Sequence, residues 1–313
     1  MSKKSFKQLL RESFKSNDTE EWLDVHFTRP VGLVFALAWN RLGIHPNVIT
    51  IVSIFLGLAA GWFFHYADLG HNVAAILLLM LANFCDSTDG QMARLSNKKT
   101  LLGRALDGFS GDVWFVAIYA AIAYRLMDQI LPGLDIKWGW FSWVLCIVAG
   151  LMCHSPQSSL ADYYRQIHLY FLKGKEGSEL DNSIDEQAKH DALPKSDWFG
   201  RLFYGNYAKY CRSQEKRTPQ FQRFFKLWSS GTGSVETRSR VREQLLAKSR
   251  PLMPYTNILT FNTRAIVLYL SALVDQVWIY PLFEIVVMTV LYLYMHKTHE
   301  MACGQLSKQL VNQ

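Results

Sequence analysis

The sequence predicts an all-α polytopic membrane protein with six transmembrane helices, an N-terminal interfacial helix and a cytoplasmic insert between helices 4 and 5. Half of the 313 residues are apolar, yet the mean hydropathy is only +0.03, because very apolar blocks alternate with polar ones. Several blocks reach about 20 residues, the length that a helix needs to cross a bilayer. The net charge of +7 suits an anionic membrane surface or nucleic acid, and the apolar blocks favour the membrane.

Residues 1–45 are expected to form a cytoplasmic amphipathic and interfacial region. Apolar side chains recur at helical spacing among Lys and Arg at Phe6, Leu9, Leu10 and Phe14. This pattern is typical of a helix on an anionic membrane surface, and a solvated or disordered tail is the alternative. Residues 30–42 predict a second helix that is too short to span a bilayer. The N-terminus lacks the continuous apolar core of a secretory signal.

Six apolar runs predict the spanning helices. Four of them fall within residues 46–170 and two within residues 251–313. The expected bounds are about 46–66, 71–95, 101–127, 139–161, 258–277 and 281–295. Only a few residues separate the last two runs, which predicts a tight helical hairpin. The final helix is expected to continue through residues 292–299 as an exposed helix.

Lys and Arg in the loops predict the orientation. They are frequent between helices 2 and 3 and in the insert, residues 171–250, and they are absent around residues 67–72. The positive-inside rule therefore places both termini and the start of helix 3 in the cytoplasm. The insert is polar but also rich in aromatic side chains, so we expect a small helical element on the membrane face rather than disorder. A direct role of the insert in substrate choice is the alternative.

Four aspartates flank two of the predicted spanning helices: Asp86, Asp89, Asp107 and Asp112. An unpaired carboxylate is costly in hydrocarbon, so something must neutralise this group. Asp86 and Asp89 share a helix face, and Asp107 begins the matching region of the next helix. Carboxylates from facing helices build metal sites inside bundles, and oxygen ligands without His or Cys favour Mg²⁺ or Mn²⁺. We expect two ions about 3.5–4 Å apart, as in phosphoryl transfer; helix capping by these aspartates is the alternative.

Small residues accompany the aspartates. Gly90, Ala93 and Gly103 leave room for a phosphate ligand to approach the backbone, and Arg94 can hold the oxygens of that ligand. A phosphate-bearing substrate is the ligand that this combination favours.

The stretch Asp86-x2-Asp89-Gly90-x2-Ala93-Arg94-x8-Gly103-x3-Asp107 resembles the signature of the CDP-alcohol phosphotransferase family, D-x2-D-G-x2-A-R-x8-G-x3-D-x3-D. The resemblance covers residues 25–170 well, residues 255–300 through architecture only, and residues 171–250 not at all. It implies a CDP-alcohol phosphatidyltransferase that makes a phospholipid and releases CMP by two-metal catalysis. It also implies metal ligands at Asp86, Asp89, Asp107 and Asp112, and a nucleotide and pyrophosphate pocket lined by Gly90, Ala93, Arg94 and Gly103.

One position departs from the signature. The fourth Asp is expected at residue 111, where this chain has Gly111, and Asp112 follows. In a regular helix, residue i+5 is rotated by about 140° from residue i, so Asp112 would point away from Asp107. We hypothesise a π-bulge near Gly108 and Gly111 that swings Asp112 back. The resemblance gives Asp112 the role of general base; without it, His154 or an oxygen on a metal would take that role.

The substrates follow less directly. A nucleotide in the cytosol and acyl chains in the bilayer favour CDP-diacylglycerol as the donor, and a CDP-choline or CDP-ethanolamine donor with diacylglycerol as acceptor is the alternative. Lys and Arg side chains at Lys98, Lys99, Arg104 and Arg264 can form a pocket for inositol phosphate or inositol, although positive-inside topology explains the same cations. A polar helix face at His154, Gln157, Ser158 and Asp162 suits an acceptor site or a satisfied bundle interior equally well.

Two other classes are weighed against the enzyme. A cation-binding transporter would need acids near the bilayer midplane on several helices, whereas these acids cluster at one end of two helices. A nucleic-acid binder would need a recognisable module, and we find none. Dimers formed through spanning helices are common in the family that the chain resembles, so a homodimer is expected.

Overall fold

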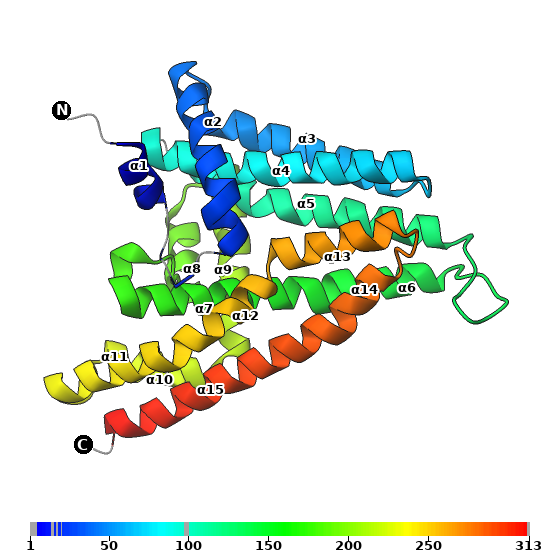
Figure 1. Ribbon diagram of the computed structural model, residues 1–313. Helices are drawn as coiled ribbons and strands as arrows, with labels where there is room; N and C mark the ends of the chain where they lie inside the picture. Colours follow the sequence, from blue (N-terminus) through cyan, green and yellow to red (C-terminus); the bar gives the residue numbers. More distant parts are fainter. Residues whose placement is uncertain (1–4, 14–15, 17, 20, 97–99, 312–313) are drawn as a thin grey trace. The chain divides into compact units, whose positions relative to one another are not determined.

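The computed structural model describes all residues except 1–4, 14, 15, 17, 20, 97–99, 312 and 313. The described part is helical and contains no strand (Figure 1). It divides into two compact units: unit 1 is Met1–Ser155 with Phe261–Val287, and unit 2 is Pro156–Thr260 with Met288–Gln313. Hydropathy and charge predict a different division, into four consecutive regions: 1–45, 46–170, 171–250 and 251–313. That division stays a prediction.

Five helices in the described residues are long and apolar enough to cross a membrane: Pro46–Phe64, Leu69–Ser96, Leu101–Leu126, Phe141–Lys173 and Ile279–Val311. Each overlaps a predicted span, and Phe141–Lys173 and Ile279–Val311 run well past the predicted ends at residues 161 and 295. The remaining predicted span, residues 258–277, contains α13 (Phe261–Leu273), which has 13 residues. Such a helix is about 20 Å long, which is short for a hydrocarbon layer of about 30 Å. The helical class, with several helices able to cross a membrane, is therefore confirmed, and the count of six is not.

Two N-terminal helices form where the sequence predicts them. They are α1 (Phe6–Ser13) and α2 (Arg29–Arg41). α2 packs closely on α4 (Leu69–Ser96), because a Cβ atom on Gly32 would lie 2.7 Å from Nε2 of Gln91. The interfacial position of α2 stays a prediction.

α3 (Pro46–Phe64) packs against both α4 and α5 (Leu101–Leu126). Its Gly57 and Gly61 face α5, and they are one helical turn apart. A Cβ on Gly57 would lie 2.0 Å from Cδ1 of Trp114, and one on Gly61 would lie 2.7 Å from Cβ of Ala117. Small residues at this spacing let two helix backbones approach closely. The α3–α5 contact therefore fixes α5, which carries Asp107.

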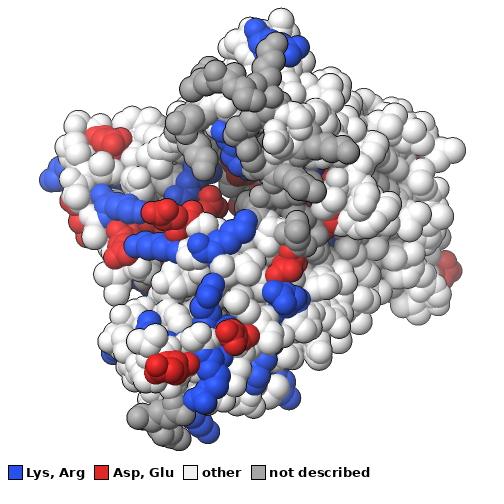
Figure 2. Space-filling model, turned by 60° about the vertical axis from the view of Figure 1, so that its left-hand side comes forward, with Lys and Arg blue, Asp and Glu red and all other residues white. Residues whose placement is uncertain are grey.

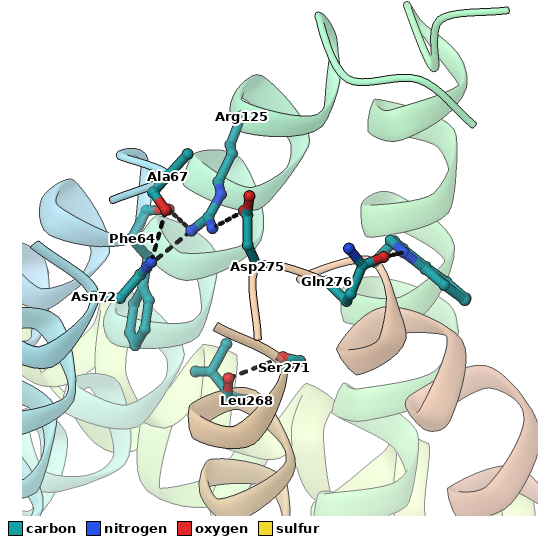
Figure 3. A network of polar contacts seen from close by, with 9 residues as sticks. Phe64, Ala67, Asn72, Arg125, Leu268, Ser271, Asp275 and Gln276 are labelled. Atoms are coloured by element: carbon teal, nitrogen blue, oxygen red, sulfur yellow. Dashed lines mark hydrogen bonds and ion pairs between the residues drawn. The ribbon is translucent and has the colours of Figure 1, made fainter. Parts of the chain in front are cut away.

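A polar network joins α3, the start of α4, the end of α5 and the loop after α13 (Figure 3). The buried guanidinium of Arg125 donates to the Phe64 carbonyl at 3.2 Å, to Oδ1 of Asn72 at 2.8 Å and to Oδ1 of Asp275 at 2.5 Å. Asp275 adopts the left-handed conformation with φ of +52°, which is uncommon for a residue other than glycine. This network closes one end of unit 1.

Two of the long helices contain a π-helical turn. One turn, Val148–His154, lies between α6 (Phe141–Ile147) and α7 (Ser155–Lys173). The other, Glu284–Met288, lies between α14 (Ile279–Phe283) and α15 (Thr289–Val311). Pro156 has no N–H to donate to the preceding turn, which is a local reason for the irregularity near His154.

Unit 2 contains the helices of the insert. They are α8 (Ser183–Ala192), α9 (Trp198–Arg217), α10 (Pro219–Ser229) and α11 (Val235–Ser249), followed by α12 (Met253–Ile258). The Glu300 carboxylate of α15 caps α10 by accepting from the N–H groups of Gln220 at 2.8 Å and Phe221 at 3.2 Å. The helical character of the insert is thus confirmed.

The end of α15 corrects one prediction. The helix does continue beyond residue 292, but it reaches Val311, and His299, Cys303 and Leu306 on it are buried within unit 2. Within residues 292–299 themselves, Leu293, Tyr294 and Lys297 are exposed as expected, whereas Met295 and His299 are buried. Lys and Arg side chains stand among Asp and Glu side chains on the face of the molecule shown in Figure 2.

Candidate active site

Three of the four predicted aspartates lie together in unit 1. Asp86 and Asp89 project from the C-terminal part of α4, and Asp107 projects from the N-terminal part of α5. One carboxylate oxygen from each residue lies within 4.8 Å of the others. Asp89 is buried, Asp86 is half-buried and Asp107 is exposed, so the group opens to the surface on the side of Asp107. The sequence prediction that α4 and α5 present these carboxylates to one another is borne out in the structure.

Two hydroxyl groups hold these carboxylates, and sequence reasoning missed both. Thr50 of α3 donates to Oδ2 of Asp89. Ser110 of α5 donates to Oδ1 of Asp86 at 2.6 Å, and also lies 2.9 Å from the carbonyl oxygen of Asp107. Ser110 follows Asp107 by three residues, so helical spacing alone could have predicted that both lie on the same face of α5. Nothing local in the sequence signals the partnership of Thr50, which depends on how α3 packs on α4.

The donor set fits a hard divalent cation. The three ligands are carboxylate oxygens, with no His or Cys among the described side chains of the group. Oxygen ligands of this kind suit Mg²⁺ and Mn²⁺. The Thr50 and Ser110 hydroxyls leave other lone pairs of the carboxylates available and orient them, as outer ligands do in metal sites.

The glycine and arginine of the predicted phosphate pocket lie beside the carboxylates. A Cβ on Gly90 would lie 3.5 Å from Nη1 of Arg94, so the exposed guanidinium of Arg94 folds back over Gly90. Ala93 is half-buried on the same helix. This arrangement places a cation over the residue that follows Asp89, and a role of these residues in nucleotide binding stays a prediction.

Gly103 has a packing role. A Cβ there would lie 2.8 Å from Oδ1 of Asn47 and 3.0 Å from Oγ1 of Thr100. Thr100 caps α5 by accepting from the Gly103 N–H at 2.9 Å. Gly103 thus lets the first turn of α5 approach the first turn of α3.

The hypothesis of a π-bulge near Asp112 is wrong. α5 is a regular α-helix throughout Leu101–Leu126. The Ser110–Asp86 hydrogen bond and the contact of Trp114 with Gly57 both fit this regular register, so no extra residue is accommodated between them. Asp112 is exposed, and among the described side chains it does not belong to the group of three carboxylates. Its roles as metal ligand and base stay predictions.

One residue of the predicted cationic pocket, Arg264, has an anionic partner within unit 1. Arg264 of α13 is buried and forms an ion pair with the buried carboxylate of Glu284. His154 lies against the same carboxylate, with Nδ1 3.6 Å from Oε1 of Glu284 and 3.2 Å from the Tyr119 hydroxyl. Of the other candidates, Arg104 is exposed, and Lys98 and Lys99 lie outside the described residues.

The polar face that follows His154 finds partners within unit 2. Gln157 donates to Oγ1 of Thr289 at 3.0 Å, and Asp162 accepts from Gln166 at 3.3 Å. These bonds favour a satisfied polar face over an acceptor site for these two residues.

Comparison with known proteins agrees with the geometry. Residues 43–159 match the model of the CDP-alcohol phosphatidyltransferase family. An uncharacterised protein of Aquifex aeolicus (strain VF5) is 38% identical over 84 residues, which are 26% of this chain and 41% of that protein. A CDP-diacylglycerol–serine O-phosphatidyltransferase of Bacillus subtilis (strain 168) is 34% identical over 92 residues, 29% of this chain and 50% of the relative.

A protein with the same name from Helicobacter pylori (strain ATCC 700392 / 26695) is 33% identical over 85 residues, 27% of this chain and 35% of the relative. The chain thus spans half or less of the length of these relatives. The family match contains all three clustered carboxylates together with Thr50, Arg94 and Ser110. Residues 43–159 of this chain form a CDP-alcohol phosphatidyltransferase domain.

Proposed function

We propose that this chain transfers the phosphatidyl group of CDP-diacylglycerol to a polar alcohol and releases CMP. The observation that carries the proposal is the group formed by Asp86, Asp89 and Asp107 within the matched domain, at adjoining ends of two long apolar helices. A pyrophosphate in water and acyl chains in lipid can meet at such a position. The bilayer is therefore the proposed environment of the protein as well as the source of its donor.

Each proposed residue has a defined task in this reaction. Asp86, Asp89 and Asp107 would hold divalent cations, two during turnover, and these supply positive charge to the pyrophosphate. The acceptor oxygen attacks the β-phosphorus of the donor, the bond from that phosphorus to CMP breaks, and CMP leaves as an anion that Arg94 helps to hold. The proton of the acceptor hydroxyl goes to Asp112 through one water, since the regular helix α5 turns this carboxylate away from the face of Asp107.

Serine is the first acceptor to test. Two of the relatives carry the name CDP-diacylglycerol–serine O-phosphatidyltransferase. Inositol phosphate and inositol rest on the predicted cationic pocket, and Arg264 of that pocket is paired with Glu284. A CDP-aminoalcohol donor with diacylglycerol as acceptor would use the same carboxylates and is the second arrangement to test.

The orientation and assembly are proposals of the same kind. Lys and Arg in the loop between α4 and α5 and in the insert support an active site that faces the cytoplasm. A homodimer remains a prediction from family resemblance.

The test is CMP release by the purified full chain in detergent with Mg²⁺. CDP-diacylglycerol is offered with serine, inositol, inositol phosphate and glycerol phosphate in turn, and CDP-choline is offered with diacylglycerol. We expect CMP and a phospholipid product with CDP-diacylglycerol and one of the alcohols, and neither product with Asp89→Asn. If no combination releases CMP and CDP gives no protection against thermal unfolding, the proposed transferase activity is contradicted.

A further inference from the structure

The face of α5 that carries Asp107 has an open position one turn further on. Residue 111 is on this face, because residues i and i+4 of a helix lie about 40° apart. It is Gly111, and a Cβ added there meets nothing within 4 Å. The next carboxylate, Asp112, is rotated by about 140° from Asp107 in this regular helix. The candidate metal site therefore has three carboxylates, and position 111 beside them carries no side chain.

Charge limits how many cations this face can hold. Three carboxylates carry three negative charges, so one divalent ion leaves a single negative charge. A second ion would reverse the sign, and the guanidinium of Arg94 beside Gly90 already adds positive charge near Asp89. Like charges a few ångströms apart repel one another. A second ion therefore needs another anion next to it.

We propose that the protein without substrate holds one divalent ion on Asp86, Asp89 and Asp107, and that a second binds only together with the pyrophosphate of a CDP-linked ligand. The second half of this statement rests on the proposed function. Pyrophosphate oxygens would then replace the carboxylate that position 111 lacks. Asp112 contributes no ligand to either ion, which leaves it available as a base.

The experiment counts Mn²⁺ bound to the purified full chain in detergent, from the electron paramagnetic resonance signal of free Mn²⁺. We expect one tight ion per chain without nucleotide. With saturating CDP we expect two, after subtraction of the Mn²⁺ bound by CDP in a protein-free sample. The Gly111→Asp variant should bind two ions without CDP, since it supplies the fourth carboxylate.

Two control variants isolate the geometry. Gly108→Asp adds the same charge to the same helix at a position that is also open, but it is rotated by about 100° from Asp107, so the count should stay at one. Asp112→Asn should also leave the count at one. If neither glycine variant folds, the count for the unmodified chain decides alone.

Two ions on the unmodified chain without CDP would overturn the proposal. So would a count that Gly111→Asp leaves unchanged, or one that Gly108→Asp raises equally. If the unmodified chain binds two ions without CDP and also releases CMP, this inference is wrong and the proposed function still holds. If the chain binds a single ion without CDP but releases CMP from no substrate pair, the proposed function is wrong and the one-ion site still holds.

Discussion

The two ends of α4 and α5 both carry charged side chains, but they balance charge differently. At the end closed by Arg125, one buried cation donates to a carbonyl, an amide oxygen and a carboxylate. Its strongest partner is Asp275, whose opposite charge cancels its own. The charge is cancelled there by the protein alone, through the Arg125–Asp275 ion pair.

At the other end, neutral hydroxyl groups donate to two of the carboxylates. Asp86 and Asp89 accept from the neutral hydroxyls of Ser110 and Thr50, and a third carboxylate, Asp107, lies within 4.8 Å. Like charges held this close destabilise a fold unless a cation joins them. The comparison teaches that the Arg125 end joins a cation to a carboxylate, whereas the other end gathers three carboxylates, a set of oxygen ligands that suits a divalent cation.

The largest expected effect comes from breaking the carboxylate end. Asp89→Asn should reduce CMP release below detection and lower Mn²⁺ affinity more than about 100-fold, because it removes a ligand. The same change should raise the unfolding temperature in metal-free buffer, since it removes one of three like charges. Thermal unfolding with and without Mn²⁺ measures both effects. A stable, active variant with normal Mn²⁺ affinity would contradict the metal assignment.

Disrupting the network around Arg125 should lower the stability of the fold and leave the catalytic activity unchanged. Arg125→Met leaves the Phe64 carbonyl and the Asn72 side chain without their buried donor, so we expect a loss of about 2–4 kcal/mol in unfolding free energy. CMP release per folded molecule should remain unchanged. Lys137→Met is the matched control, because the Lys137–Asp128 pair at 3.0 Å is exposed and should contribute less than about 1 kcal/mol. Equal losses for both variants would argue against the network.

Thr50 sharpens the comparison at the level of a single hydrogen bond. Thr50→Val removes the donor to Asp89 and keeps the shape of the side chain, so Mn²⁺ affinity should fall by about 10–100-fold. Thr50→Ser keeps the hydroxyl and should restore most of that affinity. Mn²⁺ titration of both variants makes the measurement. A purely structural role would lower the unfolding temperature of Thr50→Val and leave Mn²⁺ affinity unchanged.

The unusual backbone of Asp275 predicts a smaller effect. Asp275→Asn tolerates a φ of +52° and keeps an oxygen for Arg125, whereas Asp275→Ala loses both advantages. We expect Asp275→Ala to lose about 1–2 kcal/mol more than Asp275→Asn. Chemical denaturation of the two variants in the same detergent compares them. Indistinguishable variants would mean that neither the left-handed backbone nor the Arg125 contact matters there.

The smallest expected effect concerns pH, in the loop beside the Arg125 end. The N–H of His71, followed by its imidazole, holds the pKa of the exposed Asp68 carboxyl below its usual range. A carboxyl with a lowered folded-state pKa stabilises the fold above the unfolded pKa of about 4, and this contribution disappears as pH falls through the lower, folded value. Asp68→Asn should therefore slightly lower the unfolding temperature at pH 7 and match the unmodified chain in strong acid. A difference that persists or grows in acid would contradict this assignment.

Features that depend on the periodicity of a single helix were predicted well from the sequence. The apolar runs and the i, i+3 spacing of Asp86 and Asp89 both depend on one helix at a time, and the structure agrees with them. Contacts between helices were not predictable in the same way. The bond from Thr50 to Asp89 spans 39 residues, and the pairing of Arg264 with Glu284 required knowledge of which helices meet.

Local irregularity was the least predictable feature. Two glycines favoured a π-turn in α5, yet the π-turns of the described residues lie at Asp24–Thr28, Val148–His154 and Glu284–Met288. Glycine permits distortion but does not cause it, and packing on both sides of Ser110 keeps α5 regular. Similarly, residues 292–299 were expected to be exposed, and the burial of Met295 and His299 among them depends on packing that the sequence does not show.

The most direct test of the account is the anomalous diffraction of Mn²⁺ in crystals of the full chain grown with the ion. The account predicts a peak bounded by the carboxylates of Asp86, Asp89 and Asp107, with Thr50 and Ser110 still bonded to two of them. A peak at any other group of side chains, or carboxylates that stay in place with no ion between them, would contradict it.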